Sequence, residues 1–125
     1  MPPLHWSDQI VSIFETLHAG LSDALAVLPD DPMPGSAGES DLRSAELHDH
    51  ILTAFSQGTI LVEAAQDHLT AFVRGITQPA LTISPWASTR GILETSAISL
   101  WLLESEIGPQ VRAERTFQFR CEGLS

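Results

Sequence analysis

An arginine and a glutamate lie four residues apart in the most apolar stretch of the chain, at Arg90 and Glu94. On a helix this spacing places both side chains on one face, where they can form an ion pair. An exposed pair contributes about 0.3–0.5 kcal/mol, whereas removing one partner of a buried pair costs about 3–5 kcal/mol. Because apolar residues surround the two charges, we expect a buried structural pair. The alternatives are a surface pair and the floor of a small-ligand pocket walled by Trp86 and Trp101.

Three of the six arginines lie near the C-terminus, at Arg112, Arg115 and Arg120. Arg112 and Arg115 share a helical face, and arginines interleaved with an aromatic residue such as Phe119 can grip phosphates or stack on bases. Two nearby glutamates dilute this candidate cationic patch. We therefore expect the arginines to pair with the acidic first half of the chain, within one molecule or across a dimer, and we do not expect nucleic-acid binding.

Other reactive side chains are sparse. The single cysteine, Cys121, lies in line with apolar residues, which predicts a buried and inert thiol. No cysteines and histidines have the spacing of a zinc site, and the sequence has neither a glycine-rich phosphate loop nor a nucleophile elbow. We expect no metal and no cofactor, and the sequence favours a protein that is not an enzyme.

The chain of 125 residues carries a formal net charge of −10, and all six of its basic residues are arginine. Residues 1–67 hold eleven of the sixteen acids and one arginine, whereas the five acids and five arginines of residues 68–125 cancel. The first half should repel nucleic acid and anionic lipid, because phosphate binding depends on neutralising charge. No apolar run approaches the roughly twenty residues that cross a bilayer. We expect a cytoplasmic protein with no membrane contact.

Four stretches repeat apolar residues at three- and four-residue steps, a pattern that indicates helices. The expected helices cover residues 7–28, 41–75, 84–105 and 109–122, and the proline- and glycine-rich residues 29–40 form a flexible loop. No stretch alternates as a strand would. The sequence predicts an all-α fold with a single domain over residues 1–125, built as an antiparallel bundle of about four helices.

Two details of this bundle stay open. Gly58 either kinks the second helix or lets a neighbouring helix approach closely, since a glycine weakens a helix and has no side chain. The bundle is closed either by the last helix of this chain or by a second copy.

The third helix is the most apolar of the four. On one side it carries Trp86, Leu93, Ala97, Leu100 and Trp101. Further apolar residues widen this arc, so we expect the helix to be central and buried on more than one face.

Residues 85–115 read Pro-Trp-x3-Arg-Gly-x-Leu-Glu-x2-Ala-x3-Trp-Leu-Leu and then Pro-x2-Arg-x2-Arg, with Asp67-His68-Leu69 upstream. With this pattern, residues 64–120 resemble a group of uncharacterised helical proteins common in high-GC bacteria. The resemblance implies a helical fold but no activity. Members of the group tend to be longer, so it also implies a shortened chain or a fragment.

An Arg-x3-Glu on an apolar helix also resembles, more distantly, the HEPN superfamily of helical ribonucleases and abortive-infection proteins. Those enzymes use Arg-x4-6-His on the RNA phosphodiester, and Arg43-x4-His48 has this spacing. The resemblance implies a HEPN-like ribonuclease or toxin in which Arg43 and His48 act as the acid–base pair.

The main hypothesis from the sequence is a non-enzymatic helical-bundle protein that acts through contacts with a protein partner, as a homodimer. It rests on the wide apolar arc of residues 84–105 and on the uneven charge. The HEPN-like ribonuclease and a small-ligand-binding helical domain are the alternatives.

Overall fold

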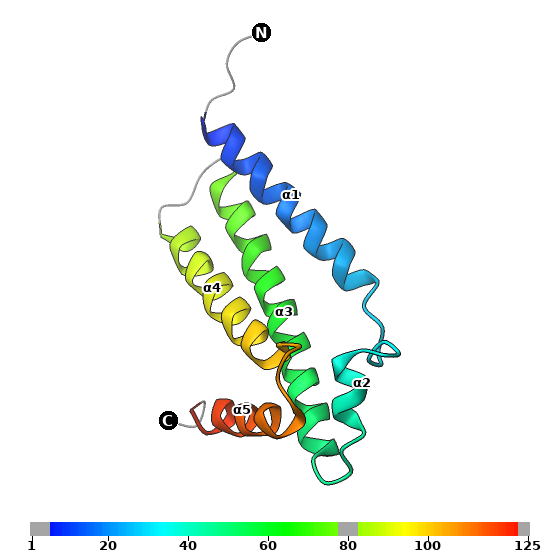
Figure 1. The fold of residues 1–125 in the computed structure, drawn as a ribbon. Helices are drawn as coiled ribbons and strands as arrows, with labels where there is room; N and C mark the ends of the chain where they lie inside the picture. The colour runs from blue at the N-terminus through cyan, green and yellow to red at the C-terminus, as the bar shows by residue number, and fades with distance from the viewer. Residues whose placement is uncertain (1–5, 78–82, 123–125) are drawn as a thin grey trace. The chain divides into compact units, whose positions relative to one another are not determined.

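The computed structural model describes residues 6–77 and 83–122, with side chains from Asp8 onwards. Within these ranges the chain is helical and has no strand, which confirms the all-α prediction. The five helices follow one another as α1 (Trp6–Ala26), α2 (Ala37–Leu42), α3 (His48–Ile76), α4 (Ser84–Leu103) and α5 (Pro109–Glu122) (Figure 1). None of the helices in the described ranges is both long enough and apolar enough to span a membrane.

The start of α3 differs from the prediction, because one helix over residues 41–75 is wrong at its beginning. The chain turns after α2, where the Ser44 N–H donates to the Asp41 carbonyl at 3.1 Å. Nδ1 of His48 lies 3.0 Å from the Leu42 carbonyl. A carbonyl only accepts, so Nδ1 carries the proton and the ring caps the end of α2. This cap separates α2 from α3.

The segment predicted as a flexible loop over residues 29–40 contains the start of α2. Ser36 is the N-cap, and its Oγ accepts from the Glu39 N–H at 3.2 Å. The Glu39 carboxylate accepts in return from the Gly35 N–H at 2.7 Å. Gly35 has a φ of +78°, a conformation that glycine adopts without strain. This reciprocal cap resembles a capping box and explains why a helix begins here.

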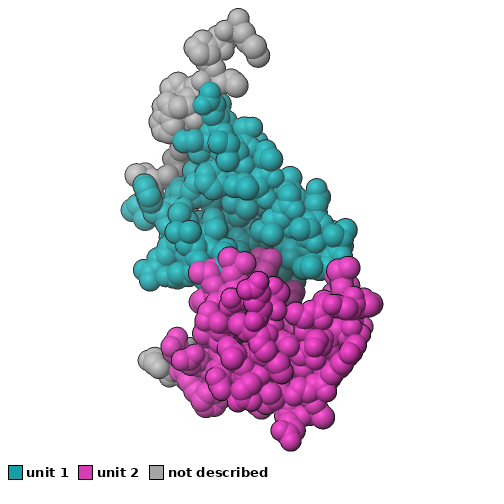
Figure 2. All heavy atoms as spheres, in the orientation of Figure 1, with its two compact units in different colours: residues 1–28, 63–96 teal, residues 29–62, 97–125 magenta. Residues whose placement is uncertain are grey.

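The chain divides into two compact units (Figure 2). Unit 1 consists of Met1–Leu28 and Glu63–Ser96, and unit 2 consists of Pro29–Val62 and Ala97–Ser125. The helices α3 and α4 therefore each contribute one part to either unit. The finer prediction, one antiparallel bundle of four helices, is not confirmed.

In unit 1, α1 packs on the second part of α3. The rings of Phe14 and Phe72 meet with their centroids 4.4 Å apart, and Ala65 and Leu69 of α3 are buried. Two side-chain hydrogen bonds join the same helices, between Gln66 and Ser22 at 2.6 Å and between His18 and Thr70 at 2.7 Å. The contact is therefore partly aromatic and partly polar.

Glycines set the approach of α3 and α4 in unit 1. The His68 ring lies against Gly91, where an added Cβ would stand 2.6 Å from the ring atoms. Near the connection of the two helices, a Cβ on Gly75 would stand 3.1 Å from the Pro85 ring. Since residue 68 meets 91 and residue 75 meets 85, these parts of the two helices run antiparallel.

In unit 2, Gly58 likewise allows α3 and α4 to approach closely. A Cβ there would stand 2.5 Å from Cγ of Leu103, and the Gly58 carbonyl accepts from Ser99 Oγ at 3.0 Å. The helix α3 runs unbroken through this position. Of the two interpretations of Gly58, close approach of a neighbouring helix is therefore the one observed. The apolar core of the unit is formed by Ile51, Ala54 and Leu102.

Candidate functional site

The most buried charge in the described chain is Arg112, in unit 2. Its side chain is 1% exposed, and Nε donates to Oδ2 of Asp41, itself 7% exposed, at 2.8 Å. The guanidinium also lies over the Phe55 ring, 5.1 Å from the centroid. Each of the three guanidinium nitrogens donates a hydrogen bond, to Asp41 or to a backbone carbonyl, which offsets the cost of removing the charge from water. The expected pairing of these arginines with the acidic first half of the chain is confirmed for Arg112.

Arg112 also caps the end of α4. Its Nη1 donates to the Leu102 carbonyl at 2.5 Å and its Nη2 to the Glu104 carbonyl at 2.9 Å. The last carbonyls of a helix have no partner within the helix, and α4 has no basic residue in its own last turn. One side chain thus ties the end of α4 and the carboxylate of Asp41 to α5. Its role is structural.

The predicted cationic patch of Arg112, Arg115 and Arg120 does not form. Arg112 is buried, and Arg115 donates to Glu104 at 2.7 Å and lies over the Trp101 ring at 5.2 Å. Only Arg120 is exposed among the three. Arg112 and Arg115 therefore bind groups inside unit 2, and these three arginines do not form a clustered surface that could bind a phosphate.

Arg90 and Glu94 form the predicted ion pair, but on the surface. Nε lies 2.6 Å from Oε1, and the two side chains are 80% and 56% exposed. The hydrogen bond from Glu94, and then its charge, raise the pKa of Arg90 above its usual value. Among the alternatives, the surface pair is observed and a buried pair is excluded, because the apolar residues around it are themselves exposed.

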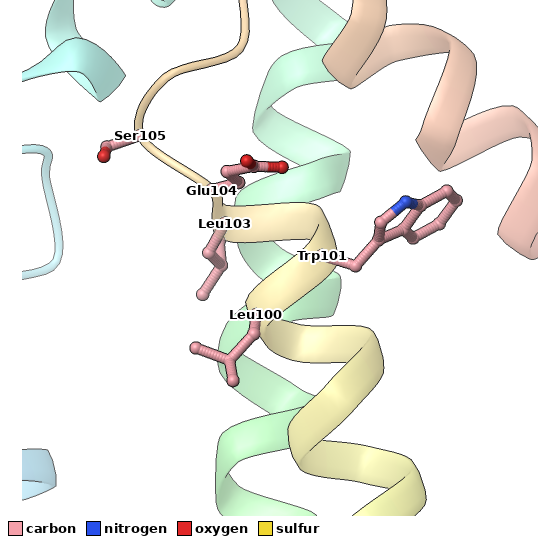
Figure 3. A pocket seen from close by; sticks show the side chains of 5 residues that line it. All are labelled: Leu100, Trp101, Leu103, Glu104 and Ser105. Carbon is pink, nitrogen blue, oxygen red and sulfur yellow. The ribbon is translucent and has the colours of Figure 1, made fainter.

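A pocket floored by this pair was an alternative from the sequence, and the pair does not line the depression that the described residues form in unit 2. The depression in unit 2 has a volume of about 590 Å³ and is lined by Leu100, Trp101, Leu103, Glu104 and Ser105 (Figure 3). In Figure 3 the Trp101 ring points away from Leu100 and Leu103. Trp101 is the only member of the predicted pocket in this lining. The depression is an open surface around the end of α4, with no set of converging polar groups.

Arg43 and His48 flank the turn between α2 and α3, and both are exposed. Nη2 of Arg43 lies 3.4 Å from Oε2 of Glu39, and His48 donates from Nδ1 to the Leu42 carbonyl. Each of the two residues thus contacts a different group. The ribonuclease interpretation stays a prediction; it requires His48→Ala to relieve any toxicity of the expressed chain.

Cys121 is exposed, so the prediction of a buried thiol is wrong. α5 is short, and its buried face is formed by Arg112 and Thr116 instead of the apolar line. In the described ranges no three histidine, cysteine, aspartate or glutamate side chains gather as a metal site would require.

The face of α4 that was expected to be buried is the exposed one. Trp86, Leu93 and Leu100 are 77%, 66% and 75% exposed. The buried face carries Ser88, Ser99 and Leu102 instead. The small serines let α4 lie close to α3, which turns the large side chains outward. We call the exposed surface formed by Trp86, Arg90, Leu93 and Glu94, all of which belong to unit 1, the α4 stripe.

The α4 stripe is the strongest candidate for a functional surface. Its signal in the sequence was the seven-residue spacing of its two large apolar residues, Trp86 and Leu93, which is the spacing of a helix–helix seam. Comparison with models of protein families, with curated protein sequences and with solved structures finds no match for this chain.

Proposed function

We propose that this chain is a non-enzymatic helical module that acts through protein contacts, and that it forms a homodimer in which a second copy covers the α4 stripe. The observation that carries the proposal is the exposure of Trp86 and Leu93, seven residues apart on the part of α4 in unit 1. A helix that is apolar on two faces is normally covered on both. In the described chain, α4 is covered on one face only.

The energy of covering the stripe is of the size that association requires. Burying a large apolar side chain contributes roughly 1.5–3 kcal/mol. Two such side chains from each of two copies contribute roughly 6–12 kcal/mol, and the cost of association is about 4–15 kcal/mol. At the lower end of that cost the surplus is enough for the dimer that we expect at tens of micromolar chain.

A second copy would also supply the additional helix that a four-helix bundle needs in unit 1. In unit 1, α1 and α4 both pack on α3, and α1 leaves Ile13 and Leu17 exposed. An additional helix on this unit would make an antiparallel four-helix arrangement. The bundle is then completed by the partner's helix, one of the two closures that the sequence left open.

The test is sedimentation of the purified chain at tens of micromolar, compared with two substitutions. Leu93→Gln should shift the chain to monomer. Ile60→Gln is the matched control, because Ile60 is 58% exposed but lies on α3 in unit 2. It should leave the dimer unchanged.

Three outcomes contradict the proposal. One is a wild-type chain that sediments as a monomer. Another is an equal effect of Leu93→Gln and Ile60→Gln, which would mean general stickiness. The third is a dimer lost with Ile13→Gln but kept with Leu93→Gln, which would place the interface on α1.

A further inference from the structure

We infer that the two copies pair α4 against α4 in antiparallel orientation about a two-fold axis at Ile92, so that Arg90 and Glu94 of each copy pair with Glu94 and Arg90 of the other. This rests on the proposed homodimer and specifies its interface. The occupant of the α4 stripe is thus the same segment of a second chain.

The spacing of the stripe fits a helix–helix seam. Trp86, Arg90 and Leu93 follow one another at steps of four and three residues, and all three are exposed. Residues at these steps face a partner helix along its whole length, as the a and d positions of a coiled coil do. A seam of this kind is long and narrow, and another helix is the partner that fits it.

The charges of the stripe are symmetric about Ile92. Arg90 stands two residues before this position and Glu94 two residues after it. When two copies run antiparallel about Ile92, residue 90 of one lies level with residue 94 of the other. Opposite charges then meet twice across the interface. In a parallel pairing in register, arginine would instead meet arginine and glutamate would meet glutamate, which disfavours that orientation.

The Arg90–Glu94 pair within one chain does not compete with this arrangement. It uses Nε of Arg90. A guanidinium has four further N–H donors, and the side chain is 80% exposed. Each arginine can therefore bridge its own Glu94 and the partner's Glu94 in a cluster of four charges.

The experiment is charge reversal, read as the dissociation constant from sedimentation equilibrium. Arg90→Glu and Glu94→Arg each gather four like charges at the axis and should weaken the dimer at least about tenfold. The double substitution Arg90→Glu with Glu94→Arg restores opposite charges and should return the dissociation constant to within about threefold of wild type. Arg74→Glu changes the net charge equally at an exposed position of α3 and should have no comparable effect.

The outcomes separate this inference from the proposed function. A wild-type dimer that both single reversals leave intact overturns the antiparallel register but not the homodimer. Single reversals that weaken the dimer without recovery in the double variant also overturn the register. A wild-type monomer overturns both. Circular dichroism of each variant confirms that the helices are retained, as expected for exposed positions.

Discussion

Each of the two compact units of this chain is stabilised internally by a different kind of contact. Unit 2 is organised around a buried arginine that binds a carboxylate and two carbonyls. Unit 1 is organised by helices that approach at glycines and by one aromatic contact. Both units leave large apolar side chains exposed, among them Trp86 and Leu93 in unit 1 and Leu100 and Phe117 in unit 2. The surface ion pair of unit 1 adds little to stability.

This difference concerns the contacts that stabilise each unit, and the α4 stripe takes part in neither set of contacts. In unit 2 the buried polar groups of the Arg112 network form hydrogen bonds with one another. Removing one of them should therefore destabilise the fold. In unit 1 the apolar groups on α4 have no cover within the described residues. We therefore expect substitutions in the unit 2 network to change folding, and substitutions on the α4 stripe to change association.

The largest expected effect is that of Arg112→Ala. It leaves the Asp41 carboxylate buried without its partner and removes the cap of α4. Breaking a buried pair in this way should lower the free energy of unfolding by about 3–5 kcal/mol, measured by urea denaturation. That is a large fraction of the roughly 5–15 kcal/mol available to a small domain.

Arg120→Ala is the matched control on the same helix, since Arg120 is exposed. Its effect should stay within about 0.5 kcal/mol. Equal losses for the two substitutions would show that unit 2 does not depend on the buried network.

A smaller effect is expected from alanine at the packing glycines. A Cβ on Gly58 would meet Leu103 at 2.5 Å, and one on Gly91 would meet the His68 ring at 2.6 Å. Overpacking of this kind costs about 1–3 kcal/mol, more than the roughly 1 kcal/mol gained in helix propensity. Thermal denaturation should therefore show both variants destabilised.

Gly20→Ala is the control for the substitutions at Gly58 and Gly91. Gly20 lies within α1, and a Cβ there would meet nothing within 4 Å. This substitution should stabilise the chain by up to about 1 kcal/mol. A gain at Gly91 equal to that at Gly20 would mean that the close contact with α4 is absent in solution.

The smallest effect concerns Glu39 in the cap of α2. The hydrogen bond from the Gly35 N–H, and then the charge of Arg43, lower the pKa of Glu39 below its usual 4.5. The cap is therefore complete above this usual value and is lost as the pH falls through the lower folded-state value. The chemical shift of the Gly35 amide proton should report a midpoint below 4.5, absent in Glu39→Gln. A midpoint at or above 4.5 in the wild type would contradict this cap.

The sequence predicted the long helices well because their determinants are local. Apolar residues at helical steps placed α1, the body of α3, α4 and all of α5. The break at residues 43–47 was missed; there the end of α2 is capped by backbone N–H groups of the turn and by the His48 ring, which meets the Leu42 carbonyl six residues away. Periodicity carries no information on such a cap.

The sites depended on contacts that the sequence does not encode locally. The Arg90–Glu94 pair was predicted because four residues separate its members, but its exposure was not. The partner of Arg112 lies 71 residues away, at Asp41. Only the packing of α5 brings these two side chains together.

The residues by themselves determined that this chain is helical and acidic, because composition and helical periodicity act over a few neighbouring positions. The tertiary structure decided which face of each helix is covered. On α4 the apolar arc extends around most of the helix, so hydrophobicity alone does not choose a side. Close packing on α3 admits Ser88 and Ser99 and leaves Trp86 and Leu93 outside.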